Sequence, residues 1–343
     1  MSRKRVLPGE ASPRVTMHQI ARAAHVSLGT VSHVINETAP VRDALKQRVL
    51  EAIEALGYRP NQLSRGLRLN RTSLIGIVIP DITNPFFPAV VRGVEDVTYK
   101  NSFRLVLCNA DNDPLKEAAY LNDLLSFLPA GIIVIPSLHS IVSLNTSAPP
   151  IVCVDSRPRG WMGDSVIVTN FKGGRDAAEH LLDMGHRQVG IVSVSNNLSV
   201  FKDRLSGFQA RMTEAGAPIS ADYIQEAHFD RASGHAAALR LLQLDPRPTA
   251  IFASSDLMAA GVLSAIRSVG LRCPEDVSLL SFDGLDISEI TYPTLTSIVQ
   301  PSYQLGRTAA QLLIDRIGGL DTPPQEIVLE TELKPRDSVA RIS

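Results

Sequence analysis

The sequence predicts a small all-α segment at the N-terminus, followed by a large α/β core with two doubly wound parallel sheets. Residues 15–58 hold three short stretches with apolar residues at helical spacing, whereas from Ser73 onward short apolar runs alternate with helical segments. These runs are too continuous to be strands with one face in water, so we expect parallel strands covered on both faces. A chain of 343 residues has room for two or three domains.

The three predicted helices have recognisable ends. Thr16 can cap the first helix and Ser27 the second, because a hydroxyl oxygen accepts from the free N–H groups of a first turn. The third helix, from Ala44 to Leu56, keeps its apolar residues on one stripe and stops at Gly57. These helices have little surface to bury, as expected of a small domain.

Eight apolar runs are predicted to be buried parallel strands. They are Leu74–Ile79, Leu105–Cys108, Ile132–Ile135, Ile151–Val154, Val166–Val168, Val189–Val194, Ala250–Ala253 and Val277–Phe282. Two sheets are needed to hold them all. The late segments Thr296–Val299 and Ile327–Leu333 are expected to cross between the two halves of the core or to form edge strands.

Charge is distributed unevenly along the chain. The formal net charge is −1, yet residues 1–71 carry +7 and the remainder carries −8. Neutralising phosphates releases counterions and dominates binding to nucleic acid, so this split favours a polyanionic partner for the N-terminal part alone.

Several classes of protein are excluded. Residues 1–14 are basic but no apolar run follows them as in a secretory signal, and no stretch approaches the length of a membrane span. We interpret Cys108, Cys153 and Cys273 as packing residues in a reducing cytosol, without a metal or redox role. The protein is therefore expected to be cytoplasmic, with a flexible arm over residues 1–14.

The N-terminal stretch carries a specific signature. Val26-Ser27, Thr30-Val31-Ser32 and Val34-Ile35-Asn36 closely resemble the head of the lactose-repressor (LacI/GalR-type) family of transcriptional regulators. The resemblance covers nearly everything after the arm. It continues through Gly57-Tyr58-Arg59-Pro60-Asn61, Ile75-Gly76, Gly185-His186-Arg187, Arg204-Leu205-Ser206-Gly207-Phe208, Pro248-Thr249-Ala250, Ser278-Leu279 and Phe282-Asp283.

Membership would imply a helix-turn-helix head on a core of periplasmic-binding-protein type. The implied domains are a DNA-binding head over 15–60, a hinge helix over 61–71 and an effector-binding core over 72–343. Within the core, the N-lobe would comprise about 72–168 and 301–326, and the C-lobe about 169–300 and 327–343.

The resemblance assigns the head's contacts with DNA. The family's base-reading positions are occupied by Leu28, Gly29 and His33. Of these, His33 alone can hydrogen-bond a base edge, so few direct contacts with bases are expected. Short hydrogen-bonding side chains near helix ends can meet phosphates, although capping alone would also explain them. These residues are Thr16, Ser27, Thr30, Ser32 and Asn36.

The hinge, residues 61–68, is a short helix in this family, paired across a dimer. Its leucine wedges into the minor groove and kinks the DNA, and here Leu67 matches that residue. Asn61 and Arg68 would also contact DNA, while Leu63 would touch its partner copy. Eight residues cannot hold a helix alone, so without DNA a flexible linker is expected.

The core would bind a small effector between its lobes. By similarity, the effector-binding residues are Phe86, Phe87, Asp155, Asn170, Arg204, Phe229, Ser255 and Asp283. Arg204 and Asp283 could hydrogen-bond the hydroxyl groups of a ligand, and the phenylalanine rings could pack against a ligand ring. The alternatives are core packing for the phenylalanines and a lobe-bridging salt link for the charged pair.

The effector class is narrowed but not identified. Around Thr30–Thr38 the head is similar to the family's purine repressor, yet Leu198 and Val200 stand where that repressor places polar groups on its base. A purine is therefore disfavoured. Sugar-responsive members often carry Asp or Asn where this chain has Ser255 and Gly284, and this difference weakens a plain sugar assignment. As effector, a sugar or sugar derivative ranks first and another polar metabolite second. Whether the effector acts as an inducer or as a co-repressor stays open, and so does the operator sequence.

Rival functions lack support in the sequence. There is no phosphate-binding Gly-Lys-Ser/Thr loop, no His/Cys cluster with zinc spacing and no Gly-x-Ser-x-Gly elbow, so neither an enzyme nor a cofactor is expected. A transport-type solute-binding protein would share the core but not the basic head. We expect a homodimer on double-stranded operator DNA, because two heads double the few base contacts and no heptad tail for tetramers follows the last strand.

Overall fold

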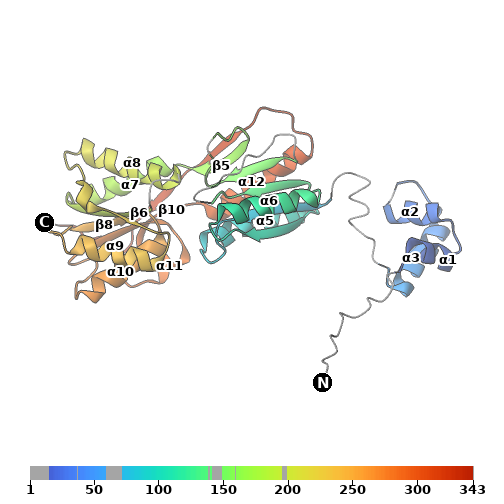
Figure 1. The fold of residues 1–343 in the computed structure, drawn as a ribbon, viewed down its shortest axis with the longest axis horizontal. Helices are drawn as coiled ribbons and strands as arrows, with labels where there is room; N and C mark the ends of the chain where they lie inside the picture. The colour runs from blue at the N-terminus through green and yellow to red at the C-terminus, as the bar shows by residue number, and fades with distance from the viewer. Residues whose placement is uncertain are drawn as a thin grey trace, which may run out of the picture. The chain divides into compact units, whose positions relative to one another are not determined.

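The computed structural model describes residues 15–36, 38–58, 72–137, 140, 149–158, 160–194 and 199–342. The chain divides into two compact units, Met1–Leu69 and Asn70–Ser343, which are considered one at a time below (Figure 1). The hinge residues Asn61, Leu67 and Arg68 lie outside the described residues, so their roles stay predictions.

The head contains the three predicted helices, α1 Met17–Ala23, α2 Leu28–Asn36 and α3 Asp43–Leu56. Thr16 and Gln19 form a capping box at the start of α1, and Gly57 ends α3 in the left-handed conformation (φ 62°). Ile20, Val31 and Val49, one from each helix, are fully buried against one another. This small core fixes the angle between α1 and α2.

Arg48 of α3 holds the turn between α1 and α2. Its Nη2 donates to the carbonyl oxygens of Ala24 and His25, the latter at 3.0 Å. His25 has a positive φ of 51°, which allows the chain to reverse within a few residues. The last carbonyl groups of α1 are thereby satisfied, and α2 starts at a defined place.

The first sheet of the core has the order β11-β5-β4-β3-β1-β2 and is parallel throughout. Its strands are β1 Leu74–Ile79, β2 Arg104–Asn109, β3 Gly131–Val134, β4 Ile151–Val154, β5 Asp164–Val168 and β11 Glu326–Leu329. Helices α5 Phe86–Lys100 and α12 Ser302–Ile317 pack on one face, where Ile75 and Ile77 point. Val78 points to the other face, toward α6 Pro114–Ser126.

The second sheet has the order β12-β10-β9-β8-β6-β7, in which β12 alone runs antiparallel to its neighbour. Its strands are β6 Val189–Val194, β7 Ile224–Ala227, β8 Ala250–Ala253, β9 Ser278–Asp283, β10 Thr296–Val299 and β12 Glu332–Lys334. Figure 1 shows one helix pair on each side of this sheet. The pairs are α7 Asn170–Asp183 with α8 Ser199–Glu214, and α9 Arg231–Leu242 with α10 Asp256–Ser268; a short α11 Asp286–Ile290 and a 3-10 turn Ala221–Tyr223 complete this lobe.

The strand Ile224–Ala227 was not predicted, because Gln225 and Glu226 interrupt its apolar pattern at the sheet edge. The expectation that Ile327–Leu333 crosses between the halves of the core or forms edge strands is confirmed: β11 is the edge strand of the first sheet, β12 is that of the second, and the chain crosses between them. The N-lobe therefore extends to Leu329, three residues past the predicted boundary. Thr296–Val299 is not an edge strand, because β10 lies inside the second sheet, and the chain crosses to the N-lobe after it.

In the described part of the core, three segments connect the N-lobe and the C-lobe. They follow β5, β10 and β11, at Thr169, at Gln300 and at residues 330–331. Two of them are joined directly, since the Thr331 N–H donates to Thr169 Oγ1 at 3.0 Å and the two threonine hydroxyls lie 3.1 Å apart. The lobes are thus connected by adjacent chain segments that share hydrogen bonds.

Helices α7 and α8 cross with their backbones in contact. A Cβ atom added at Gly174 would lie 2.1 Å from the carbonyl oxygen of Arg204, and one added at Gly207 would lie 2.0 Å from that of Phe171. Only glycine fits at such distances. This crossing fixes the position of Arg204 along α8.

We predict that Gly174→Ala destabilises the core by about 1–3 kcal/mol, because the added methyl group must push α7 and α8 apart. Urea unfolding of the full chain measures the change, and Lys202→Ala, at an exposed position of α8, serves as the control. Equal stability of Gly174→Ala and the control would contradict the close crossing.

Candidate functional site

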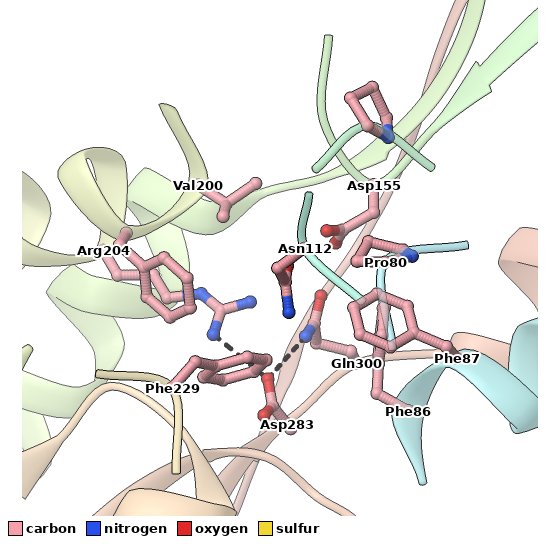
Figure 2. A pocket seen from close by; sticks show the side chains of 12 residues that line it. Pro80, Phe86, Phe87, Asn112, Asp155, Val200, Arg204, Phe229, Asp283 and Gln300 are labelled. Atoms are coloured by element: carbon pink, nitrogen blue, oxygen red, sulfur yellow. Dashed lines mark hydrogen bonds and ion pairs between the residues drawn. The ribbon is translucent and has the colours of Figure 1, made fainter. Parts of the chain in front are cut away.

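A cavity lies between the two lobes, at the carboxyl ends of the strands in both sheets. The N-lobe contributes Pro80, Phe86, Phe87, Asn112, Pro136 and Asp155; the C-lobe contributes Val200, Phe201, Arg204, Phe229 and Asp283; and Gln300 comes from a connecting segment. Figure 2 shows these side chains converging from both sides. Six of the eight predicted effector residues are therefore brought together here.

The other two predicted residues do not line the cavity. Asn170 is buried behind it and accepts a hydrogen bond from Arg204 Nε at 2.8 Å. Ser255 is fully buried and caps α10, accepting from the Met258 N–H at 3.2 Å. Asn170 positions Arg204 and Ser255 caps a helix, so both lie behind the lining, and their contact with an effector stays a prediction.

Arg204 and Asp283 form a buried ion pair within the C-lobe. Arg204 Nη1 donates to Asp283 Oδ1 at 3.0 Å and to the Ser254 carbonyl oxygen at 2.7 Å, and both side chains are only 3% exposed. The guanidinium stacks on Phe282, 3.8 Å from the ring centroid. Because α8 and β9 belong to the same lobe, the alternative of a lobe-bridging salt link is wrong.

Gln300 extends this ion pair to a connecting segment. Its Nε2 donates to Asp283 Oδ1 at 2.7 Å, and its backbone N–H donates to the Asp283 carbonyl oxygen at 2.9 Å. A carboxylate accepts only, so the amide nitrogen must face Asp283 and the carbonyl oxygen must face the cavity. Figure 2 shows Gln300 turned in this way.

Asp155 enters the cavity from the N-lobe side. It has a positive φ of 66°, and its backbone N–H donates to the Val166 carbonyl oxygen at 2.9 Å. Its Oδ1 has no hydrogen-bond partner among the described residues. Burial raises the pKa of this carboxyl to about 7; the Arg204 charge lowers it and the Asp283 charge raises it further.

A second buried carboxylate, Asp256, supports the site from behind. It accepts from the Ser281 hydroxyl at 2.5 Å, from the Ser297 hydroxyl at 3.1 Å and from the Leu285 N–H at 2.6 Å. Burial, followed by the Asp283 charge, raises the pKa of Asp256 to about 7. Leu285 follows β9 of the C-lobe and packs into the hydrophobic core of the N-lobe. By accepting from its N–H, Asp256 therefore holds a loop through which the two lobes contact each other.

Aromatic rings form the apolar walls. Phe86 and Phe87 of α5 meet edge to face with centroids 5.4 Å apart, and Phe201 and Phe229 pair similarly at 5.2 Å. Phe229 packs against the hydrophobic clusters of both lobes. The cavity can therefore hold a flat or ring-shaped molecule with polar groups at its edge.

Six lining residues were not among the predicted effector residues: Pro80, Asn112, Pro136, Val200, Phe201 and Gln300. Asn112 lies in the polar turn that follows β2, and Gln300 directly follows β10, so each had a signal: a polar side chain at the carboxyl end of a strand. Phe201 sits in the first turn of α8, where its aromatic residue type alone gave no indication. Val200, which was considered only as a departure from purine binding, lines the cavity as well.

On the head, the predicted base-reading residues lie on one exposed surface of α2. Leu28, Gly29 and His33 are exposed, and the His33 Nδ1 lies 2.9 Å from the Thr38 hydroxyl, which leaves Nε2 available. Ser27 and Thr16 cap their helices and remain exposed. The amide nitrogen of Asn36 donates to the Ser32 carbonyl oxygen at 2.9 Å, so part of its hydrogen-bonding capacity is already used.

A compact helical head with an exposed recognition helix, and a two-lobed core around a polar cavity, together define a ligand-responsive DNA-binding protein. Comparison with known proteins identifies the family. The family model "Bacterial regulatory proteins, lacI family" matches residues 16–61, and the model "Periplasmic binding protein-like domain" matches residues 178–339.

Among curated relatives, the HTH-type transcriptional repressor PurR of Mannheimia succiniciproducens is 36% identical over 332 residues, covering 96% of this chain and 99% of that protein. Catabolite control protein A of Priestia megaterium is 36% identical over 303 residues, covering 87% and 91%. The chain belongs to the LacI family and is a DNA-binding transcriptional repressor. The family consists of regulators, which confirms that the chain is not an enzyme.

Solved structures agree with this assignment. The transcriptional regulator CelR in complex with cellobiose is 32% identical, with a TM-score of 0.72, covering 95% of this chain and all of that one. A LacI family regulator from Enterococcus faecium with bound ribose is 31% identical, with a TM-score of 0.71, covering 79% of this chain. No helix in the described part of the chain could span a membrane, and its His, Cys, Asp and Glu residues form no group able to hold a metal ion.

We predict that Asp155→Asn stabilises the protein at pH 8 by on the order of 1–3 kcal/mol, and that the gain falls by more than half at pH 5. The ionised carboxylate is costly to bury above its folded pKa of about 7. As the pH falls toward the unfolded value near 4, the folded chain binds its proton first and the cost disappears. Asparagine tolerates the positive φ of this position.

Urea unfolding at the two pH values measures this effect, with the exposed Asp222→Asn as the control. A gain that does not change between pH 5 and pH 8 would show that Asp155 does not titrate in this range.

Proposed function

We propose that a small polar effector, a sugar or sugar derivative, binds in the cavity between the lobes and controls the affinity of the repressor for its operator. The observation that carries this proposal is the composition of the cavity. Buried acceptor oxygens of Asp155 and Gln300 stand without partners among the described residues, beside aromatic walls supplied by both lobes. Sugars present hydroxyl donors around a ring with apolar faces, which suits such a lining.

The connections between the lobes support control of DNA binding. A ligand that touches both lobes favours one arrangement of them over another, and only this difference in affinity can shift an equilibrium. Gln300 belongs to a connecting segment and also lines the cavity. The hinge, with Asn61, Leu67 and Arg68 contacting DNA, would carry the change to the heads.

A second candidate effector is a purine base, because several relatives are repressors named PurR. The phenylalanine rings could sandwich a purine as well as a sugar ring. Against this, Val200 presents hydrocarbon to the cavity and offers no hydrogen bond to base edges. The similar structures that contain cellobiose and ribose support the sugar class.

A thermal-shift screen on the full chain separates the candidates, because a ligand that binds the folded state raises its melting temperature. The panel contains ribose, cellobiose, other neutral sugars and the purine bases hypoxanthine and guanine. Each hit is then added to an operator-binding titration. A sugar that both raises the melting temperature and changes operator affinity supports the proposal, and a response to purine bases alone would refute the sugar assignment.

We predict that Asn112→Gly weakens effector binding at least tenfold while operator affinity without effector is retained. Asn112 stands at the centre of the lining and has a positive φ of 56°, which glycine adopts without strain. The control is Asp111→Gly, whose neighbouring position has a similar φ of 54° but an exposed side chain. Calorimetric titration with the hit from the screen measures the change, and unchanged affinity would remove Asn112 from the site.

We predict that His33→Ala weakens binding to the operator roughly tenfold to a hundredfold, the range of about 1–3 kcal/mol for one base contact, and weakens binding to random DNA much less. Among the described residues of α2 that match base-reading positions, His33 is the one able to hydrogen-bond a base edge. Fluorescence anisotropy on both DNAs measures this, with Gln47→Ala on α3 as the control. An equal loss on both DNAs would assign His33 to the DNA backbone.

We propose further that the working unit is a homodimer on a near-palindromic operator. Leu28 and Gly29 add no hydrogen bond to a base edge, so one head offers too few contacts for specific binding. Sedimentation velocity at micromolar concentration is expected to give a dimer. A monomer that still binds operator tightly, or a stable tetramer, would contradict this assembly.

A further inference from the structure

Thr38 lies outside the recognition helix but contacts a side chain that belongs to it. The Thr38 hydroxyl oxygen is 2.9 Å from Nδ1 of His33. The two residues are five positions apart, and they can meet because α2 ends at Asn36 and the chain then leaves the helix. Both residues are exposed, so their hydrogen bond lies on the surface of the head.

This hydrogen bond is the directed contact that holds the His33 ring. A helical side chain lies over the residues three and four positions before it, which here are Thr30 and Gly29. Gly29 offers no side chain to pack against, and Thr30 Oγ1 is already 2.9 Å from Ser27 Oγ. Among the described residues, Thr38 is therefore the one hydrogen-bond partner of the ring.

The fold itself does not require a glycine beside the ring. A Cβ atom added at Gly29 would have Ser27 Oγ as its nearest neighbour, at 3.7 Å, which is an ordinary van der Waals contact. The absence of a side chain at this position leaves open space on the face of α2 that also carries His33. A base edge can therefore approach His33 without meeting another side chain from the preceding turn.

The Thr38 contact distinguishes two orientations of the ring. The terminal torsion of histidine is broad and nearly two-fold, so a half-turn of the ring costs little by itself. Such a half-turn exchanges Nδ1 with a ring carbon and also exchanges Nε2 with a ring carbon. The hydrogen bond from Thr38 favours the orientation in which Nε2, and not carbon, occupies the outer position.

The same contact bears on what Nε2 presents to a base. When the Thr38 hydroxyl donates to Nδ1, the ring hydrogen is on Nε2, and in the imidazolium form Nε2 is a donor as well. In the major groove guanine presents N7 and O6 as neighbouring acceptors, whereas adenine has an amine donor beside its N7. A donor at Nε2 therefore fits guanine better than adenine.

We propose that Thr38 is a positioning residue that determines base specificity through His33: its hydroxyl donates to Nδ1 and holds Nε2 toward the bases as a donor to N7 of a guanine in the operator. This inference rests on the proposed function and extends the reading of DNA to a residue that follows the recognition helix. Thr38 contributes by restricting the ring, without touching the base.

The test begins with selection of binding sites from randomised duplex DNA by the full chain, which requires no known operator. The base pair read by His33 is the pair whose preference disappears in His33→Ala. Thr38→Val keeps the shape of the side chain but removes the hydroxyl, and it should lower the preference at this pair about threefold to tenfold, the range for one hydrogen bond. Preferences at the other pairs should remain, and Thr38→Ser, which keeps the hydroxyl, should behave as the unaltered chain.

Fluorescence anisotropy on the selected site separates positioning from a direct contact with DNA. If Thr38 acts through His33, adding Thr38→Val to His33→Ala changes the affinity by less than about twofold. A further loss as large as that of Thr38→Val alone would assign Thr38 to the DNA and overturn the positioning role. Replacing the guanine of the read pair by 7-deazaguanine, which lacks N7, should weaken binding about threefold or more; no weakening would overturn the donor assignment.

Failure of this inference and failure of the proposed function give different results. Unchanged base preference in Thr38→Val, or a preference that survives in His33→Ala at every pair, would overturn the inference while specific DNA binding stands. If the unaltered chain enriches no site from the randomised DNA, the proposed control of an operator fails as well.

Discussion

The buried ion pair between Arg204 and Asp283 is the interaction on which the arrangement of the cavity depends. Burying two charges is costly, and the cost is offset only when geometry and additional hydrogen bonds are good. Here Asn170, the Ser254 carbonyl oxygen and Gln300 supply those bonds. Removing either charge would leave the other buried and unpaired, at a cost of about 3–5 kcal/mol. The pair therefore organises the site as well as lining it.

The same pair reaches two of the three connections between the lobes. Gln300 is itself in one connecting segment, and Asn170 directly follows Thr169, which lies in another and shares hydrogen bonds with Thr331 of the third. The connecting segments and the Arg204–Asp283 ion pair of the cavity are thus linked by hydrogen bonds. A ligand that engages Gln300 acts on a group that is bonded to both the ion pair and the connection, which is the kind of contact that can distinguish two lobe arrangements.

Sequence patterns predicted most of the fold because buried parallel strands need continuous apolar runs and helix ends need specific residues. Leu74–Ile79 and Val189–Val194 were predicted for the first reason, and the start of α1 at Thr16 for the second. The edge strand Ile224–Ala227 was not, since its outer side meets no neighbour and tolerates Gln225 and Glu226. For residues 327–333 the sequence left a crossing and an edge strand as alternatives, and only the tertiary pairing shows that both occur, with the change of sheet at Thr331.

Site residues were harder to predict, because family resemblance gives positions but not orientations. Asn170 and Ser255 lie close to the cavity, yet their side chains are already hydrogen-bonded. Asn170 accepts from Arg204, and Ser255 caps α10. Asn112 and Gln300 do face it, for reasons that depend on turns after β2 and β10. Which polar side chain enters a cleft is decided by tertiary hydrogen bonding, and no one-dimensional pattern contains that information.

The head and the core carry opposite net charges, and this affects how each interacts with DNA. A head of +7 is attracted to any DNA, whereas a core of −8 is repelled from it, so the core adds little unspecific affinity of its own. Binding then depends on how the head is presented, and under the proposed function a ligand in the core changes this presentation. Leu28 and Gly29 of α2 offer no hydrogen bond to a base edge, so few base contacts are available to compensate when the head is badly oriented on DNA. Under the proposed function, a recognition helix with few base contacts and an acidic core together make operator binding sensitive to the state of the cavity.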